Sequence, residues 1–331
     1  MEMGKIMGSA IAIINPKNNQ VLSLLNGSLQ DAEGNIFPII GGVPRIAQLD
    51  NYTSSFGMQW NQFDIIQLDR ETDGHNISHQ RFFAETNWNA QDLSEKNILE
   101  VGSGAGRFSK VVLESTSATL YSIDFSDAVT ANFKNNSSIA ANRLHLFQAS
   151  IYEMPFPDDS FDKVFCLGVL QHTPDFDASV KALIRKAKPG GEIVVDFYPI
   201  NGWWTKIHAK YILRPITKRL SHKRLMQMID SNINWLMKSE QILHRLGLGM
   251  LARFLPIVDI QGTLPKYLSE TEKREWAVLD TFDMFSPEYD NPQRIRDVAD
   301  MFKRHGADVT FAGFEHFDGF ASAVVRGIKQ S

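Results

Sequence analysis

The chain has 331 residues, of which 43% are apolar, and its formal net charge is −4. This size and composition predict a large core and more than one structural unit, and the small negative charge argues against a general attraction to nucleic acid. Cys166 is the only cysteine, so an intrachain disulfide is excluded and a reducing compartment is indicated. Because no secretory signal and no run of about eighteen apolar residues occurs, we expect a cytoplasmic protein that does not span a membrane.

The first part of the chain, residues 1–50, predicts a small β module. Short strand-like runs are separated by Asn-Pro, Asn-Gly and Glu-Gly-Asn turn signals and occupy residues 11–14, 21–25, 28–29 and 36–40. So small a β unit is marginal alone. We therefore expect it to be stabilised by packing on the rest of the chain.

Residues 51–95 form a segment rich in aromatic side chains. These recur at helical spacing, as Phe56, Trp60 and Phe63 in the first half and as Phe82 and Phe83 in the second. The pattern predicts helices that pack on a sheet. The alternative, that one of these helices covers a bound ligand as a lid, stays open.

A glycine-rich turn follows a predicted buried strand at residues 98–101. Gly102, Gly104 and Gly106 stand at alternate positions, and glycine can take φ > 0 and leave bare backbone against a ligand. A helix is predicted directly after them, so the stretch has the form of a nucleotide-binding corner in an α/β sheet. A dinucleotide pattern would need its third glycine where Arg107 stands, which disfavours a NAD-dependent oxidoreductase.

Further strands are predicted at 119–123 and 144–147, and the first of them ends on Asp124. An acid about twenty residues past the glycine turn, at the tip of the second strand, is placed to bind ribose hydroxyls. A fourth strand before His172 and a fifth that follows Lys188 complete the central part. A helix at 293–305 and strands at 307–311 and 321–325 close the chain.

Four motifs in order resemble the class I S-adenosylmethionine (SAM) methyltransferases. Glu100–Gly106 has the form E-x-G-x-G-x-G of the family's first motif. Residues 154–162 and 172–175 are similar to the L-P-F-x-D-x-S-F-D loop and the H-x-x-D turn of the ubiquinone and menaquinone C-methylases. The run from Lys188 resembles the family's K-P-G-G turn. The resemblance to this Methyltransferase-11 type of domain implies a Rossmann-like α/β fold, with a seven-stranded sheet, helices on both faces, and SAM as cofactor.

The resemblance also implies a set of cofactor-binding residues. They are Glu100, Gly102, Ser103, Gly104, Gly106, Arg107, Asp124, Phe125, Ser150, Ile151 and Leu167. The family usually has an Asp after the third strand, where this chain has Ser150. A serine hydroxyl still accepts a hydrogen bond from the adenine, and the neighbouring Ile151 offers its backbone N–H.

Gly27–Arg45, with its F-P-I-I-G-G-V-P-R tail, resembles the small zinc-ribbon (Trm112-like) module found before bacterial methyltransferase domains. This chain has none of the four cysteines of that module. We therefore expect a degenerate ribbon, and we assign no metal ligands anywhere in the chain.

The expected domains are the β module 1–50, the helices or lid 51–95, the methyltransferase domain 96–200 with 285–331, and a helical insertion 201–284. Residues 202–224 of the insertion hold seven Lys or Arg and no acid. Three readings stay open: a solvated helix face, a site for an anionic acceptor, and a membrane-surface helix, because Trp203 and Trp204 stand beside the cations. Pro215 is expected to confine any helix to one side of it.

His172 is the candidate general base, since an imidazole titrates near neutral pH and the residue follows the fourth strand. The alternative is a structural histidine in a turn. Tyr198 and Asp196, at the end of the fifth strand, are expected to line the acceptor site. His208 and His316 are further histidines that could reach it.

The sequence therefore predicts a methyltransferase (EC 2.1.1.-) that acts on a small-molecule or glycan-precursor acceptor, with an anionic acceptor as one option. We expect a cytoplasmic enzyme, with a peripheral contact through residues 203–224 at the inner membrane face as a further option and no nucleic-acid partner. The alternative function is a SAM-binding or regulatory protein without catalytic activity.

Overall fold

The computed structural model describes residues 11–47, 53–70, 76–140, 142–265 and 267–331. The chain divides into two compact units. The first comprises Met1–Pro199, Tyr289–Phe317 and Ala321–Ser331, and the second comprises Ile200–Glu288 with Asp318–Phe320.

A seven-stranded sheet forms the centre of the first unit, in the order β10-β11-β9-β8-β5-β6-β7. Its strands are β5 (Asn97–Val101), β6 (Thr119–Asp124), β7 (Leu144–Gln148), β8 (Phe161–Cys166), β9 (Ala187–Phe197), β10 (Ala307–Phe317) and β11 (Phe320–Lys329). The strands β5 to β9 pair in parallel, and β11 joins β9 antiparallel. The predicted α/β class and the seven-stranded sheet are confirmed.

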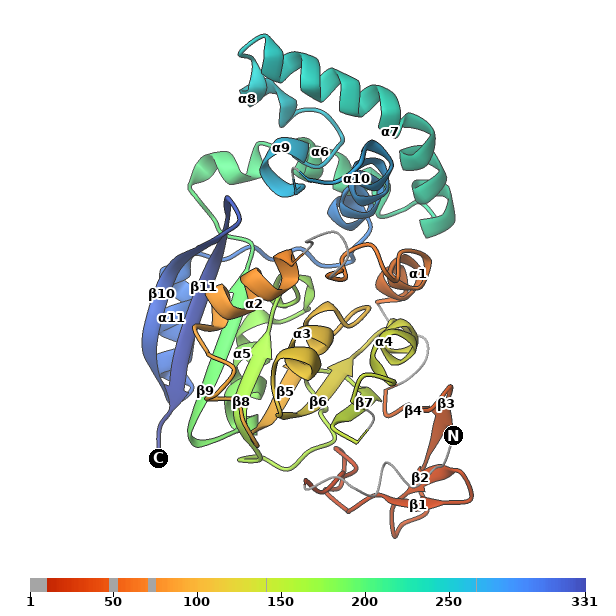
Figure 1. Ribbon diagram of the computed structural model, residues 1–331, viewed down its shortest axis with the longest axis vertical. Coiled ribbons are helices and arrows are strands. Elements are labelled where there is room, and N and C mark those ends of the chain that lie inside the picture. The colour runs from red at the N-terminus through yellow and green to blue at the C-terminus, as the bar shows by residue number, and fades with distance from the viewer. Residues whose placement is uncertain (1–10, 48–52, 71–75, 141, 266) are drawn as a thin grey trace. The chain divides into compact units, whose positions relative to one another are not determined.

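Helices cover both faces of this sheet (Figure 1). They are α1 (Ser54–Gln62), α2 (Ile77–Thr86), α3 (Arg107–Ser115), α4 (Val129–Asn136), α5 (Phe176–Lys186) and α11 (Ile295–Arg304). Successive residues of a strand point to opposite faces, and β5 shows the result. Ile98 packs in the cluster that contains Phe108 of α3, whereas Leu99 packs in the cluster that contains Val180 of α5. Burial on both faces explains why the parallel strands read as continuous apolar runs.

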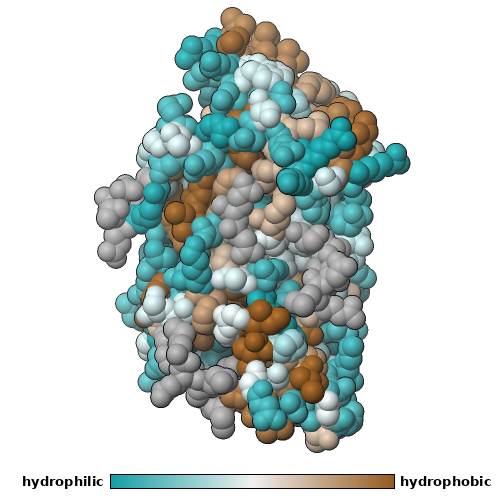
Figure 2. Space-filling model, turned by 90° about the vertical axis from the view of Figure 1, so that its right-hand side faces the viewer, coloured by the Kyte–Doolittle hydropathy of each residue, from teal (hydrophilic) through white to brown (hydrophobic). Residues whose placement is uncertain are grey.

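A four-stranded sheet makes up the described part of the N-terminal module, with β1 (Ser23–Leu25), β2 (Ser28–Gln30), β3 (Ile36–Ile40) and β4 (Val43–Pro44) in sequential order. The predicted run at 11–14 contributes only an isolated bridge, Ile14 to Val21. Several apolar side chains of the module remain exposed, namely Val21, Leu25, Ile36 and Ile40, and brown surface gathers low on the face shown in Figure 2, where the module lies.

Arg45 fastens the module to the large sheet. Its guanidinium is buried and donates to Asp127 at 2.9 Å, to the amide oxygen of Gln148 at 3.1 Å and to the hydroxyl of Thr130 at 2.9 Å. The backbone N–H of Ile46 also donates to Gln148, at 2.8 Å. The module is therefore held by specific polar contacts as well as by apolar packing.

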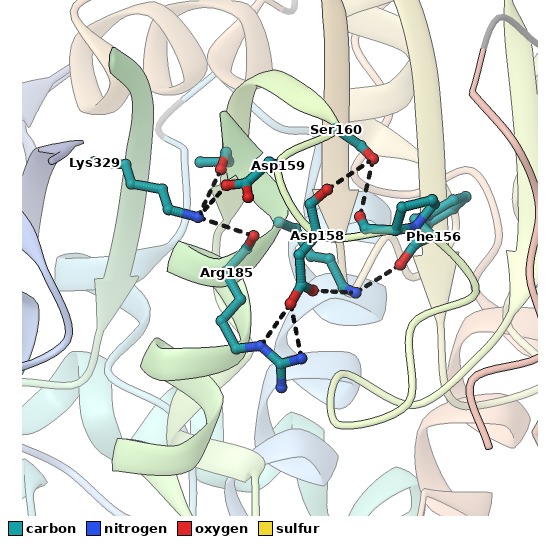
Figure 3. A network of polar contacts seen from close by, with 9 residues as sticks. Phe156, Asp158, Asp159, Ser160, Arg185 and Lys329 are labelled. Carbon is teal, nitrogen blue, oxygen red and sulfur yellow. Dashed lines mark hydrogen bonds and ion pairs between the residues drawn. The ribbon is translucent and has the colours of Figure 1, made fainter. Parts of the chain in front are cut away.

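Charged residues at the amino end of β8 and the end of β11 form the network in Figure 3. Asp158 accepts from Arg185 at 2.8 Å and from Lys186 at 2.9 Å. The ammonium group of Lys329 donates to Asp159 at 2.6 Å and to the backbone carbonyl of Arg185 at 3.1 Å. The network ties the closing strand to the loop before β8, at the edge of the sheet opposite to the glycine turn.

The second unit is helical among its described residues. It contains α6 (Ala209–Thr217), α7 (His222–Arg245), α8 (Gly249–Ala252), α9 (Ile260–Thr263) and α10 (Glu270–Phe285). Helix α10 packs against α7 and α6, and α7 packs against α8. No helix in the described part of the chain is both long and apolar enough to cross a membrane.

The expectation that Pro215 confines a helix to one side is wrong, because α6 continues through this proline. Only two residues of the helix follow it, so the lost backbone hydrogen bond lies near the C-terminus. The last turn is also anchored: Arg214 is buried and donates to the carbonyls of Met284 at 3.3 Å and Pro287 at 2.8 Å.

Candidate active site

The turn between β5 and α3 depends on its glycines. Gly102, Gly104 and Gly106 have φ of +84°, +52° and +87°, a region that costs residues with a Cβ about 1–2 kcal/mol. Space is also limited, because a Cβ on Gly102 would lie 2.3 Å from Cγ2 of Val169. At Gly106 a Cβ would lie 2.3 Å from Oδ1 of Asn132. The pattern G-x-G-x-G thus reflects both backbone conformation and close approach.

Asp124 joins the end of β6 to this turn. Its Oδ2 accepts from the backbone N–H of Gly104 at 2.8 Å, and its Oδ1 accepts from the N–H of Ser126 at 2.8 Å and from the Ser126 hydroxyl at 2.7 Å. Burial raises the pKa of Asp124, while the bonds from Ser126 and Gly104 act against that rise. The structure therefore brings the predicted ribose-binding acid next to the predicted glycine turn.

Glu100 is the first acid of the motif and is 1% exposed. Its Oε2 accepts from the hydroxyls of Ser109 and Ser122, the second at 2.7 Å. Burial raises the pKa of Glu100 to about 7, and the neighbouring charge of Asp124 acts in the same direction. Oε1 of Glu100 and the hydroxyl of Ser103 are buried and have no hydrogen-bond partner among the described residues. These unsatisfied atoms, at the strand end and in the turn, are suited to a polar ligand.

Helix α1 lies against the same turn. The indole Nε1 of Trp60 lies 3.3 Å from where a Cβ of Gly104 would stand, and the backbone N–H of Asp127 lies 3.3 Å from the corresponding position of Gly57. Of the predicted aromatic segment, residues 51–52 and 71–75 lie outside the described residues. Helix α1 therefore covers the glycine turn. That it acts as a lid over a bound ligand stays a prediction.

Arg107, the residue that replaces the third glycine of a dinucleotide motif, contacts residues that precede it in the chain. It donates to Oε1 of Gln67 at 3.0 Å and to the hydroxyl of Ser78 at 3.2 Å, and its guanidinium lies 4.9 Å from the ring centroid of Phe108. Arg107 therefore links α3 to α2 and to the segment before it.

The predicted adenine-side residues follow the strands β6, β7 and β8. Ile151 and Leu167 are buried, after β7 and β8 respectively. The hydroxyl of Ser150 accepts from the N–H of Tyr152 at 3.2 Å, and the carbonyl of Phe125 accepts from the side-chain amide of Gln148 at 3.1 Å. All of them lie at the carboxyl edge of the sheet, where ligands of such sheets bind.

His172 lies in a short 3₁₀ helix, Leu170–His172, after β8 and is largely buried. Its Nδ1 lies 3.1 Å from the backbone carbonyl of Tyr289, and a carbonyl only accepts, so Nδ1 carries the proton. This tautomer leaves the lone pair on Nε2. The rings of Phe56 and Tyr198 lie beside the imidazole, with centroids 5.2 Å and 5.6 Å away.

Asp196 and Tyr198 differ in accessibility. Tyr198 is 38% exposed, whereas Asp196 is 4% exposed. The Asp196 carboxylate accepts from the guanidinium of Arg81 and from the backbone N–H of Gly168. The structure thus brings Tyr198 together with His172, and it engages Asp196 in holding Gly168 and α2.

Some residues near the site were not found from the sequence. Val169 contacts the glycine turn, and Arg81 binds Asp196 from 115 residues away. Gln171, next to His172, is fully buried, and its side-chain amide has no hydrogen-bond partner in the described part of the chain. Gln171 could have been found from the sequence, because it is a polar residue next to the predicted base His172. The other contacts join distant segments, so no local pattern indicates them.

Comparison with known proteins agrees with this geometry. Residues 99–195 match the family model described as a methyltransferase domain. The glycine turn lies within this stretch, which is similar to a methyltransferase domain, and the match supports SAM as its cofactor.

Relatives of the chain include two named enzymes. The tRNA U34 carboxymethyltransferase of Nautilia profundicola is 26% identical over 150 residues, which is 45% of this chain and 48% of that protein. The ubiquinone/menaquinone biosynthesis C-methyltransferase UbiE of Vibrio vulnificus is 32% identical over 129 residues, or 37% of this chain and 50% of that protein. The chain thus spans about half the length of these relatives.

Solved structures with a similar arrangement include the magnesium protoporphyrin IX methyltransferase of Synechocystis PCC 6803 with bound SAH. It is 14% identical, covers 84% of this chain and 97% of its own, and has a TM-score of 0.46. The complex of the Trm112 activator of Haloferax volcanii with a methyltransferase is 10% identical, with 84% and 98% covered and a TM-score of 0.46. Similarities at these identities and TM-scores do not indicate which acceptor this chain methylates.

Proposed function

We propose that the chain is a SAM-dependent methyltransferase that methylates a small-molecule or glycan-precursor acceptor. The observation that carries the proposal is the bond between Asp124 and the N–H of Gly104 at 2.8 Å, because it joins a ribose-binding acid to a turn with bare backbone. The match of residues 99–195 to a methyltransferase domain supports it.

The residues around the turn fit the cofactor. SAM, when bound, supplies an activated methyl group on a sulfonium. In the proposal its methionine part lies over Gly102–Gly106, where the unsatisfied oxygens of Glu100 and Ser103 meet its polar groups, and its ribose lies on Asp124. Removing that carboxylate in Asp124→Ala should weaken SAM binding by about 1–3 kcal/mol. Calorimetric titration that gives equal affinities for variant and parent would contradict this placement.

His172 acts as the base in this proposal. Because Nδ1 is bonded to the carbonyl of Tyr289, Nε2 can take the proton of an acceptor hydroxyl as its oxygen is methylated. Tyr198, which is partly exposed beside the ring, is placed to position the acceptor. Holding the acceptor in line with the methyl group can lower the barrier by about 7–11 kcal/mol.

A labelled-methyl assay over a panel of hydroxylated acceptors tests this role. His172→Gln should lower the turnover by about 10²–10⁴-fold, the usual contribution of a general base, while SAM affinity stays unchanged. His305→Ala is the matched control, because this imidazole bonds Asp177 on another helix. Tight SAM binding without turnover of any acceptor would favour the alternative, a SAM-binding protein without catalytic activity.

The basic segment 203–224 is proposed to favour an anionic or membrane-proximal acceptor at the inner face of the membrane. Arg219, Lys223 and Arg224 are exposed. Trp203 and Trp204 are also exposed, at 69% and 52%, and their rings stack at 3.8 Å. Exposed aromatic rings beside cations suit an anionic interface. Nucleic acid is not proposed, since the cations gather in one segment of a chain with net charge −4.

Charge reversal tests this part of the proposal. Replacing Arg219, Lys223 and Arg224 by Glu should raise the acceptor KM or abolish binding to phosphatidylserine vesicles, with SAM affinity unchanged. Zwitterionic vesicles serve as the control, and added salt should weaken binding of the parent protein. If neither acceptor kinetics nor vesicle binding responds, the segment is a solvated face.

A further inference from the structure

Three donor groups come together in the helical unit, apart from any residue assigned to methyl transfer. Glu240 and His244 are one turn apart on α7, so they share a face of that helix. Asp259 is the N-cap of α9, an element that Figure 1 shows in the same unit. One ligand atom from each residue lies within 4.8 Å of the other two.

Glu240 is the buried member of this group. It is 1% exposed, and its Oε1 lies 3.1 Å from Nε2 of His244. The two atoms nevertheless lack hydrogen-bond geometry, and Oε1 has no hydrogen-bond partner among the described residues. A buried carboxylate oxygen without a hydrogen bond is costly. A cation between Oε1 and Nε2 would satisfy both lone pairs.

Two glycines leave space for the side chains of His244 and Asp259, because a Cβ at either position would clash with them. A Cβ on Gly249 would lie 2.7 Å from Nδ1 of the His244 ring, and a Cβ on Gly262 would lie 2.5 Å from Oδ2 of Asp259. The N–H of Gly262 donates to Oδ1 of Asp259 at 3.0 Å. This bond uses one carboxylate oxygen and leaves Oδ2 for a ligand.

We propose that Glu240, His244 and Asp259 bind a divalent transition-metal ion, Zn²⁺ by their donor chemistry. An imidazole nitrogen with two carboxylate oxygens selects a transition metal, because Mg²⁺ and Ca²⁺ take oxygen donors. The two carboxylates balance the charge of a dication. Three protein ligands leave a fourth position for water, and the exposed Asp259 gives the ion a path of entry.

Binding requires a small movement. Donors about 2.0–2.2 Å from Zn²⁺ lie closer together than 4.8 Å. The exposed carboxyl of Asp259 can move toward the buried pair by rotation of its side chain. The ion would then join the end of α7 to the start of α9. This site goes beyond the proposed methyl transfer and does not depend on it.

The test is a titration of the chelator-treated full chain with ZnCl₂, followed by calorimetry and by elemental analysis after dialysis. We expect one equivalent of Zn²⁺ and a higher Tm in its presence. Asp259→Asn keeps a good N-cap but removes the charge, and His244→Ala removes the nitrogen donor. Each should lower the affinity at least about tenfold, the smallest loss expected even for outer-sphere changes.

Two further variants sharpen the test. Gly249→Ala improves helix propensity but displaces the His244 ring, so it should weaken Zn²⁺ binding without removing a donor. His305→Ala is the matched control, because its Nε2 also lies 3.1 Å from a carboxylate oxygen, that of Asp177, but has Arg304 rather than a second acid beside it.

Co²⁺ gives a spectroscopic signature of the same site. Its visible absorption should show four-coordinate bands in the parent protein and lose them in the Asp259→Asn and His244→Ala variants. No saturable Zn²⁺ binding, or equal affinity in the parent and in both donor variants, would overturn the proposal. Loss of binding in His305→Ala as large as in His244→Ala would overturn it as well, since the ion would then lie elsewhere.

Discussion

The replacement of Gly102 by Ala separates the two physical reasons for a glycine in the turn. The backbone at Gly102 has φ +84°, and a Cβ there would lie 2.3 Å and 2.8 Å from the two methyl carbons of Val169. Gly168 is a matched position, because its φ is +77° but nothing lies within 4 Å of a Cβ. Gly168→Ala therefore reports backbone strain alone.

The expected magnitudes follow from these contacts. Strain at positive φ costs about 1–2 kcal/mol, so Gly168→Ala should lower the free energy of unfolding by this amount. Overpacking against Val169 adds about 1–3 kcal/mol, so Gly102→Ala should cost about 2–5 kcal/mol. Trimming the partner in Gly102→Ala/Val169→Ala should recover about 1–3 kcal/mol relative to the sum of the single changes.

Urea unfolding followed by circular dichroism measures the free energies of the parent and the variants. A calorimetric SAM titration of the same proteins shows whether the clash also disturbs the cofactor site. Equal costs at Gly102 and Gly168, or no coupling between Gly102 and Val169, would refute the argument from close approach.

Two other predictions concern buried charges. Arg45→Met should lower the free energy of unfolding by about 1–3 kcal/mol, because it leaves the side-chain oxygen of the buried Gln148 without a donor. Asp127→Ala should cost less than about 1 kcal/mol, since that side chain is 58% exposed. Equal costs of the two changes in urea unfolding would contradict this difference. Burial raises the pKa of Glu100 from 4.5 to about 7, so the folded state holds a proton that the unfolded state loses first, and stability should fall by about 3 kcal/mol at most as the pH rises through this window. In Glu100→Gln this loss of stability with rising pH should be absent. A urea-unfolding profile of the variant with the same dependence on pH as the parent would contradict the assignment to Glu100. Asp124 is the other acid that faces Glu100.

The local part of the site could be predicted from the sequence. The β5 strand, the three glycines and the position of Asp124 are set within about 25 residues of chain, and strand periodicity and glycine conformation are local properties. The fold class follows from the order of these elements. The number of strands in the sheet was implied by the resemblance to the class I methyltransferases and not by these local properties.

Contacts between distant segments could not be predicted in the same way. Asp196 reads as a polar residue at a strand end, but the structure engages it with Arg81, 115 residues earlier. The pair Glu240 and His244 has a recognisable i, i+4 spacing, yet the third donor, Asp259, comes from another helix. Pro215 was misjudged because the anchoring of Arg214 on the carbonyls after α10 is invisible in the local pattern.

The strand order has a consequence for how the chain is made. β11 follows β10 in the chain, yet it lies between β10 and β9. Until residues 320–329 have left the ribosome, β9 therefore presents an unpaired edge, and such edges invite aggregation. The contact of Lys329 with Asp159 forms when the last residues of β11 pair between β10 and β9. A nascent chain stalled before Phe320 should consequently depend on chaperones far more than one that has extended past Lys329.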